Sequence, residues 1–201
     1  MEYRDIISEE EQERIINACQ DLGTKALFGL LYISGARISE LCNSYIRENI
    51  RNDKKELIEI RYVGNRCGLL AKDIVVSGRD VSITLPIRKK RSKVKSEHTL
   101  VFDINTPYMD VILEHAETKS PEEPLFDIST RTAQRYIKKI DSDLKLNGVI
   151  CKLFRNTRLT KIAKLATTEE EIKQWAGHAD TRSLSRYIAM KPITSFKRMI
   201  R

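Results

Sequence analysis

The sequence predicts a mainly helical α+β fold with a small antiparallel β-sheet near the middle of the chain. Apolar residues recur at helical spacing in the first and last thirds of the chain. Between about residues 56 and 103 they recur at every second position, which is typical of strands. The 201 residues are enough for one domain with a core and scarcely enough for two. We therefore expect residues 1–201 to form a single domain.

The first third of the chain reads as three helices. Ser8 and Glu11 form a capping-box pattern, followed by apolar residues on one helical face at Ile15, Ile16 and Cys19. The stretch 24–34 predicts a second helix, which Gly35 ends. A third helix is predicted over residues 36–45, from an apolar stripe at Ile38, Leu41, Cys42 and Tyr45.

The middle of the chain predicts strands, and helices return after it. Alternating, β-branched patterns over residues 56–63, 80–87 and 98–102 predict strands, with turns at Gly64, Gly68 and Gly78. A proline-containing connector follows at residues 119–126. Further helices are expected over residues 129–144, 152–166, 168–176 and around 182–190. Thr168 and Glu171 form a second capping-box pattern.

Composition favours an acidic partner and a reducing compartment. The formal charge of +8 and the pI near 9.3 make nucleic acid the first candidate partner. The sequence has neither a long apolar run nor a signal-peptide pattern, so we expect a soluble intracellular protein without a membrane partner. Four cysteines lie far apart, without a C-x-x-C pair, and we expect buried reduced thiols and no metal site. They are Cys19, Cys42, Cys67 and Cys151.

Four places in the sequence carry residues suited to phosphate chemistry. In "GARISEL", Glu40 lies three residues after Arg37 and can orient its guanidinium, although a surface ion pair has the same spacing. In the run 88–95, six of eight residues are cationic, between two predicted strands. A hairpin tip of this charge suits phosphate contacts, and a solvated charge run is the alternative.

The other two places lie in the last quarter of the chain. Lys152 and Arg155 in "KLFRNT" are three apart on a helix, so we expect both cations on one face, where a phosphate would relieve their repulsion. In "WAGHADTRSLSRY", His178 follows the helix-ending Gly177 and precedes Tyr187 by nine residues. Taken alone, a helical tyrosine usually packs in a core.

Together and in order, these boxes resemble the catalytic domain of the tyrosine recombinase (phage integrase) family. The family pattern has a G-x-R-[IVL]-S-E-L box, a lysine on a β-hairpin, an H/K-x-x-R box and an L-G-H box with a tyrosine nine residues after the histidine. The corresponding stretches are "GARISEL", "RKKRSKVKSEHTLVF", "KLFRNT" and "WAGHADTRSLSRY". They span almost the whole chain. Trp175 and Ala176 replace the usual leucine of the L-G-H box.

The resemblance implies a role for each matching residue. Arg37 and Arg155 would hold the scissile phosphate, since guanidinium groups suit its non-bridging oxygens. His178 would add a hydrogen bond, and Tyr187 would attack phosphorus to give a 3′-phosphotyrosyl linkage and a free 5′-hydroxyl. Glu40 would support Arg37.

The hairpin lysine would protonate the departing 5′ oxygen. Counting back from "HTLVF" leads to Lys93, which we prefer, and counting forward from "ITLP" leads to Lys90.

Lys152 stands where histidine is commoner, and its ordinary pKa near 10.4 suits added positive charge better than a base. This K-x-x-R form is similar to that of archaeal viral integrases. Further DNA contacts are expected from Arg88, Lys89, Arg91, Lys95, Arg158 and Arg182.

The resemblance further implies the cofactors and partners. The chemistry needs neither metal nor ATP, and Asp141 and Asp143 fit a solvated helix end better than a metal nuclease site. Double-stranded DNA is the expected partner, with a homotetramer on DNA and residues 188–201 either docking on a neighbour or forming a free tail. We expect a cytoplasmic, nucleoid-associated enzyme in the host cell, lacking the family's N-terminal core-binding domain. Two alternatives stay open: a type IB topoisomerase-like enzyme and a non-catalytic DNA-binding module.

Overall fold

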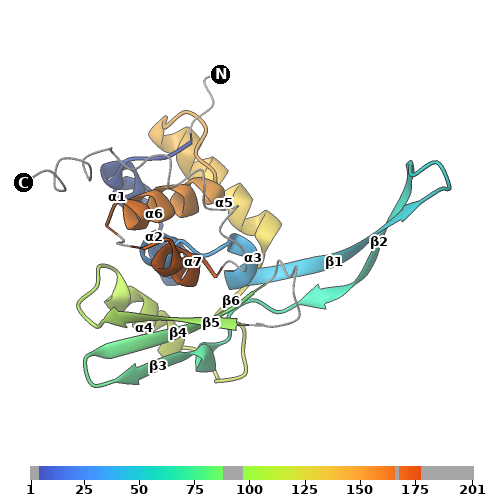
Figure 1. The fold of residues 1–201 in the computed structure, drawn as a ribbon. Helices are drawn as coiled ribbons and strands as arrows, with labels where there is room; N and C mark the ends of the chain where they lie inside the picture. The colour runs from blue at the N-terminus through green and yellow to red at the C-terminus, as the bar shows by residue number, and fades with distance from the viewer. Residues whose placement is uncertain (1–4, 88–96, 166–167, 178–201) are drawn as a thin grey trace, which may run out of the picture.

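The computed structural model describes residues 5–87, 97–165 and 168–177, and within these ranges it is an α+β fold. Most of the helices gather in one layer, and a three-stranded sheet lies beside them (Figure 1). The helices are α1 (Glu9–Asn17), α2 (Leu22–Ser34), α3 (Ile38–Leu41), α4 (Met109–Glu117), α5 (Thr130–Leu144), α6 (Cys151–Leu165) and α7 (Glu169–Ala176), with a short 3-10 helix η1 (Ala71–Asp73). The strands are β1 (Cys42–Arg51), β2 (Leu57–Arg66), β3 (Ile74–Ser77), β4 (Asp80–Pro86), β5 (Glu97–Asp103) and β6 (Phe126–Ser129).

The helix ends follow the local signals in the sequence. Ser8 and Glu11 form a reciprocal capping box at the start of α1, with the Ser8 N–H donating to the Glu11 carboxylate over 2.9 Å. Thr168 and Glu171 form the same box at the start of α7. Gly35 ends α2 in the left-handed region at φ +63°. These predictions are confirmed, because each depends only on residues within one turn of the helix end.

Two separate three-stranded sheets form where one was predicted. In the first sheet, β4 lies between β3 and β5 and all pairs are antiparallel. Pro86 lies opposite Glu97, so the basic run at 88–95 connects the adjacent ends of two paired strands. In the second sheet, β1 lies between β2 and β6, and β1 pairs with β6 in parallel. The α+β class is confirmed.

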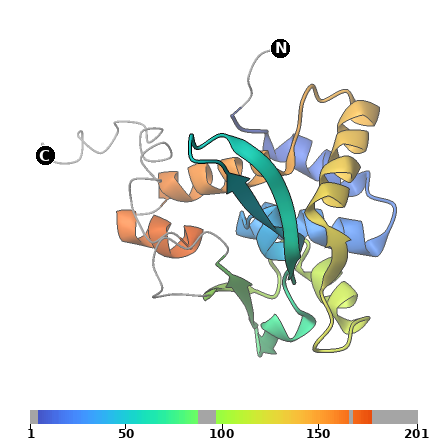
Figure 2. The same cartoon turned by 90° about the vertical axis from the view of Figure 1, so that its right-hand side faces the viewer.

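The predicted helix over residues 36–45 is wrong beyond Leu41. Only Ile38–Leu41 is helical, and from Cys42 the chain continues as β1 and pairs with β2 in a long two-stranded ribbon that projects from the body (Figures 1 and 2). Tyr45, expected on the apolar stripe, is 56% exposed. Tyr45 pairs with Asn65, 20 residues later in the sequence, and this strand pairing overrides the local helical spacing.

Helix α2 is the centre of the core. It contacts α1, α4 and α6, and its Phe28 ring stacks on Phe154 of α6 with centroids 5.9 Å apart. Helix α4, which was not predicted, packs against α2, where Met109 and Ile112 are fully buried. None of the helices in the described ranges combines the length and the apolar character needed to cross a membrane.

The four cysteines form no disulfide. Cys42 and Cys151 are buried, and burial raises the pKa of the Cys151 thiol to about 12. Cys19 is half-buried, and burial followed by the nearby Asp21 charge raises its pKa to about 12 as well. Cys67 is exposed near the end of the ribbon, so the prediction of burial is wrong for this residue.

Candidate active site

The first box of the predicted site forms a fixed corner between α2 and β1. The Arg37 N–H donates to Glu40 Oε2 over 2.8 Å, and Arg37 Nη1 lies 2.5 Å from Glu40 Oε1. The Glu40 side chain is fully buried, whereas the Arg37 side chain is 19% exposed. A buried carboxylate bound to both ends of one arginine restricts that side chain to a narrow range of positions. The supporting role predicted for Glu40 agrees with this geometry.

Arg155 of α6 joins the ends of two other helices. Its Nη1 donates to the Gly35 carbonyl over 2.7 Å and its Nη2 to the Ala176 carbonyl over 2.9 Å. Arg155 is only 8% exposed. Gly35 follows α2 and Ala176 ends α7, so one guanidinium connects segments that lie 141 residues apart in the sequence. Buried carbonyl groups need such donors, because an unpaired one costs about 1–3 kcal/mol.

Trp175 makes a second connection between the same segments. Its Nε1 donates to the Ser34 carbonyl over 3.0 Å, and its ring meets Phe102 of β5 edge-on with centroids 5.6 Å apart. The Arg158 guanidinium lies over the Trp175 ring at 5.3 Å from the centroid. The stretches "GARISEL", "KLFRNT" and "WAG" therefore meet at one place.

His98 of β5 belongs to the same cluster and was not predicted. The pKa of its imidazole is lowered, chiefly by burial, while the Glu40 charge raises it and the Arg155 and Arg37 charges lower it. Its ring packs against Gly177, where an added Cβ would lie 2.8 Å from both Cε1 and Nδ1. No pattern in the sequence marks this histidine. The only hint is its place directly after the basic run, at the start of the strand "HTLVF".

Lys152 does not share the environment of Arg155. Arg155 is buried, whereas Lys152 is exposed and makes no hydrogen bond or ion pair with the described residues. Residues three apart on a helix differ by about 60° in direction, which is enough to place one at the core and the other in solvent. The two cations therefore differ in burial, and their joint contact with one phosphate stays a prediction.

Two other predictions concern residues with structural contacts. The Asp141 carboxylate accepts hydrogen bonds from the Gly148 and Val149 N–H groups, at 3.1 Å and 3.0 Å, so it holds the loop after α5. No group of three or more possible metal ligands occurs within residues 5–87, 97–165 and 168–177.

Arg158 packs on Trp175 and is half-buried, with its pKa lowered mainly by burial. Its contact with DNA stays a prediction.

The remaining predicted residues lie outside the described ranges. They are the catalytic candidates Lys90, Lys93, His178 and Tyr187 and the DNA-contact candidates Arg88, Lys89, Arg91, Lys95 and Arg182. The described chain resumes at Glu97, just after the basic run, where β5 begins. It also reaches Gly177, directly before His178, where α7 has just ended. Both of these ends lie at the cluster, since His98 contacts Gly177.

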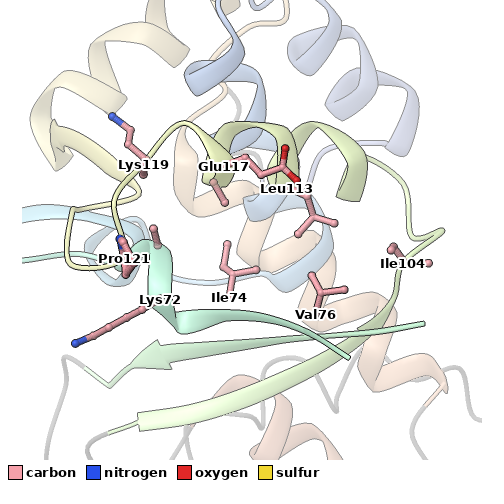
Figure 3. Close-up of a pocket in the computed structure, with 10 residues that line it drawn as sticks. Lys72, Ile74, Val76, Ile104, Leu113, Glu117, Lys119 and Pro121 are labelled. Atoms are coloured by element: carbon pink, nitrogen blue, oxygen red, sulfur yellow. The ribbon is translucent and has the colours of Figure 1, made fainter. Parts of the chain in front are cut away.

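A separate open pocket of about 550 Å³ lies between α4 and the strand β3 (Figure 3). Ile74 and Val76 line it from the sheet, and Leu113 lines it from the helix. Its Lys72 side chain forms an ion pair with Glu122. Among the residues that the structure describes, none from the four boxes lines this pocket, so we do not include it in the candidate site.

The cluster has the composition of an anion site. Arg37 and Arg155 supply two guanidiniums against the single carboxylate of Glu40. Arginines that are held by fixed partners before a ligand arrives suit planar recognition of a phosphate. The α+β fold and the meeting of these stretches agree with the class that the sequence resembles, the tyrosine recombinases.

Comparison with known proteins agrees with this class. A model of the Phage integrase family matches residues 5–192, and the chain belongs to that family. No curated protein matches the chain by sequence. The fold is similar to the XerA recombinase, with a TM-score of 0.66 at 16% identity over 99% of this chain and 65% of that one.

Two further structures share the fold. The catalytic domain of bacteriophage HP1 integrase has a TM-score of 0.59 at 13% identity, over 94% of this chain and 90% of that one. The XerH site-specific recombinase bound to its difH substrate has a TM-score of 0.63 at 12% identity, over 92% of this chain and 50% of that one. The chain thus spans between half and two thirds of the length of the two recombinases.

Proposed function

We propose that the chain is the catalytic part of a site-specific DNA recombinase or integrase that works through a 3′-phosphotyrosine intermediate. The observation that supports this most is the cluster of Arg37 and Arg155. The two arginines lie 118 residues apart in the sequence (155 − 37 = 118), in a chain that belongs to the Phage integrase family. Both side chains have fixed partners, Glu40 for one and two backbone carbonyls for the other. This fixed arrangement suits a phosphate whose negative charge increases in the transition state.

The reaction that we propose exchanges one phosphodiester bond for another. The Tyr187 oxygen attacks phosphorus, its phenol proton leaves to a base, and the bond from phosphorus to the 5′ oxygen breaks. Lys93, or Lys90 in its place, donates a proton to that oxygen, so that a neutral 5′-hydroxyl departs. Arg37, Arg155 and His178 stabilise the charge on the non-bridging oxygens. Rejoining reverses these steps, and the energy of the broken bond is kept in the phosphotyrosine.

Lys152 enters this proposal as a source of positive charge and not as the base. Lys152 is exposed, so a phosphate can reach it from solvent. An exposed cation suits contact with a DNA phosphate, in the manner of a point charge.

The proposed partner is double-stranded DNA, bound by several copies of the chain that assemble into a tetramer on two duplexes. The XerH structure includes its difH substrate, and a related Tn1549 transposon integrase structure includes DNA of its circular intermediate. Such an enzyme works where the DNA of its host lies, so we propose a cytoplasmic, nucleoid-associated location. The charge of +8 agrees with a DNA partner.

A nicked duplex that carries the target sequence tests the function. After incubation and denaturing electrophoresis, we expect a covalent protein–DNA band that is absent in the Tyr187→Phe variant. A plasmid with paired sites then separates the alternatives. Deletion or inversion supports a recombinase, relaxation without exchange supports the topoisomerase-like enzyme, and binding without any covalent band supports the DNA-binding module.

A further inference from the structure

His98 lies where three elements of the candidate site meet, yet it is part of none of the four sequence boxes. It is the second residue of β5 and pairs across the sheet with Leu85. The charges of Arg37 and Glu40 from α3 and of Arg155 from α6 all act on its imidazole. From α7, the backbone of Gly177 contacts its ring.

The contact with Gly177 is close and specific. A Cβ added to Gly177 would meet Cε1 and Nδ1 of His98 at 2.8 Å and Cγ at 3.2 Å, so the edge of the ring occupies the space of a side chain. Gly177 has φ +59° and ends α7 with its N–H directed at the Gln174 carbonyl. The preceding residue, Ala176, accepts the hydrogen bond from Arg155. Side chains from β5 and α6 therefore hold consecutive residues at the end of α7, immediately before His178.

Burial favours the neutral form of His98, the Glu40 charge opposes this, and the Arg155 and Arg37 charges support it. Arg37 and Arg155 bring two positive charges and Glu40 one negative charge, so a protonated imidazole would add a third positive charge to the cluster. Its Nδ1 is buried without a hydrogen-bond partner among the described residues. Burial makes protonation costly in free energy, because water no longer solvates the imidazolium. The pKa of His98 is lowered for these reasons.

We propose that His98 is a positioning residue of this site: its neutral imidazole packs on Gly177 and fixes the end of α7 beside Arg155 and Arg37. Protonation of the ring would push a positive charge against two guanidiniums and displace the end of α7 that precedes His178. The site therefore loses its arrangement at acidic pH. The part of this inference that concerns catalysis rests on the proposed function, whereas the contact between His98 and Gly177 does not.

Two measurements test it with the full chain. The first is the rate of covalent adduct formation on the nicked duplex between pH 5 and 8, for the wild type and the variants His98→Asn, His98→Ala and Thr99→Ala. Thr99 is the matched control, because it is the next residue of β5, is exposed, and forms a hydroxyl–hydroxyl hydrogen bond with Thr84 across the sheet. We expect His98→Ala to lower the rate at pH 7.5 by about tenfold or more, the size of a loss of about 1.4 kcal/mol.

The pH profile separates positioning from packing alone. We expect the rate of the wild type and of Thr99→Ala to fall with acid in a transition below about pH 6.5. Asparagine keeps a polar atom near the Nδ1 position and does not titrate. The fall in rate with acid should therefore move or disappear in His98→Asn. An unchanged acid transition in His98→Asn, or a wild-type rate in His98→Ala, would overturn the inference.

The second measurement needs no catalysis. Urea unfolding of Gly177→Ala, His98→Ala and the double variant forms a cycle. The added methyl collides with the His98 ring, so we expect the midpoint of the double variant to fall by less than the sum of the two single shifts. If the midpoint shift of the double variant equals the sum of the two single shifts, the His98 ring does not hold Gly177. If the wild type gives no adduct but the coupling is present, the proposed function fails and the contact stands.

Discussion

Replacing Arg155 with alanine should damage both the stability and the chemistry of this protein. The variant leaves the Gly35 and Ala176 carbonyls, now bonded at 2.7 Å and 2.9 Å, without their donors in a buried place. At about 1–3 kcal/mol for each carbonyl, the free energy of unfolding should fall by about 2–6 kcal/mol. For a chain of this size each kcal/mol lowers Tm by about 2–4 °C, so we expect a decrease between about 4 and 24 °C.

Differential scanning calorimetry measures this loss, and the adduct assay, run well below the lower Tm, measures the chemistry. Removing one preorganised donor to a transition-state oxyanion costs about 100-fold to 1000-fold in rate. Arg155→Lys keeps the charge but not the two-pronged geometry, so it should recover only part of the stability. Arg135→Ala, on the exposed face of α5, is the control and should stay within about 0.5 kcal/mol of the wild type. If Arg155→Ala melts and reacts like the wild type, the reasoning about the cluster is wrong.

Three other predictions concern separate parts of the molecule. Gly35→Ala should lower the free energy of unfolding by well over the ~1 kcal/mol that its positive φ alone would cost, because the added Cβ would lie 2.9 Å from Arg158 Cβ. Gly78 has a similar φ and nothing within 4 Å of an added Cβ, so Gly78→Ala is the control. Urea unfolding measures both variants, and equal losses would show that the collision at Gly35 costs nothing. At pH 8 an alkylating reagent should modify the exposed Cys67 quickly, and it should modify Cys19, Cys42 and Cys151 only when the protein unfolds. Mass spectrometry measures the modification, and a modified Cys151 in the native protein would contradict this expectation. Lys93→Ala should slow cleavage more than Lys90→Ala, and a 5′-thiol leaving group should restore the Lys93→Ala rate, since a thiolate needs little protonation; equal effects would leave our choice of lysine unsupported.

Local patterns in the sequence predict much of this fold because the signals are complete within a few residues. The capping boxes at Ser8 and Thr168 and the glycine end of α2 at Gly35 each involve contacts inside one helical turn. The alternating strands β4 and β5 were predicted for a similar reason, since one face of each is buried. In these elements the local preference and the packing agree.

The ribbon β1–β2 shows where local patterns fail. Residues 38–45 have the apolar spacing of a helix, but the chain from Cys42 onward pairs with β2 and, at its base, with β6, which begins 84 residues later (126 − 42 = 84). No local signal carries that pairing. The same holds for His98, whose role depends on Arg37, Arg155 and Gly177, all more than 50 residues away in the sequence.

The candidate site was predicted by the order of its boxes, and the structure explains why the boxes meet. Arg155 and Trp175 connect the end of α2 to the end of α7, so "GARISEL" and the "WAG" stretch lie together because of contacts that these stretches and "KLFRNT" make. The sequence does not predict that Lys152 and Arg155 differ in burial, because residues three apart on a helix can lie on either side of the boundary between core and solvent.

The central claim is that one phosphodiester bond is held by arginines from distant boxes while a tyrosine attacks it. Mass spectrometry of the protease-digested adduct from the nicked duplex tests this most directly. We expect a single DNA-linked peptide with the 3′-phosphate on Tyr187, and no linked peptide from Tyr187→Phe. A linkage at another residue, or an adduct that persists in Tyr187→Phe, would contradict the claim.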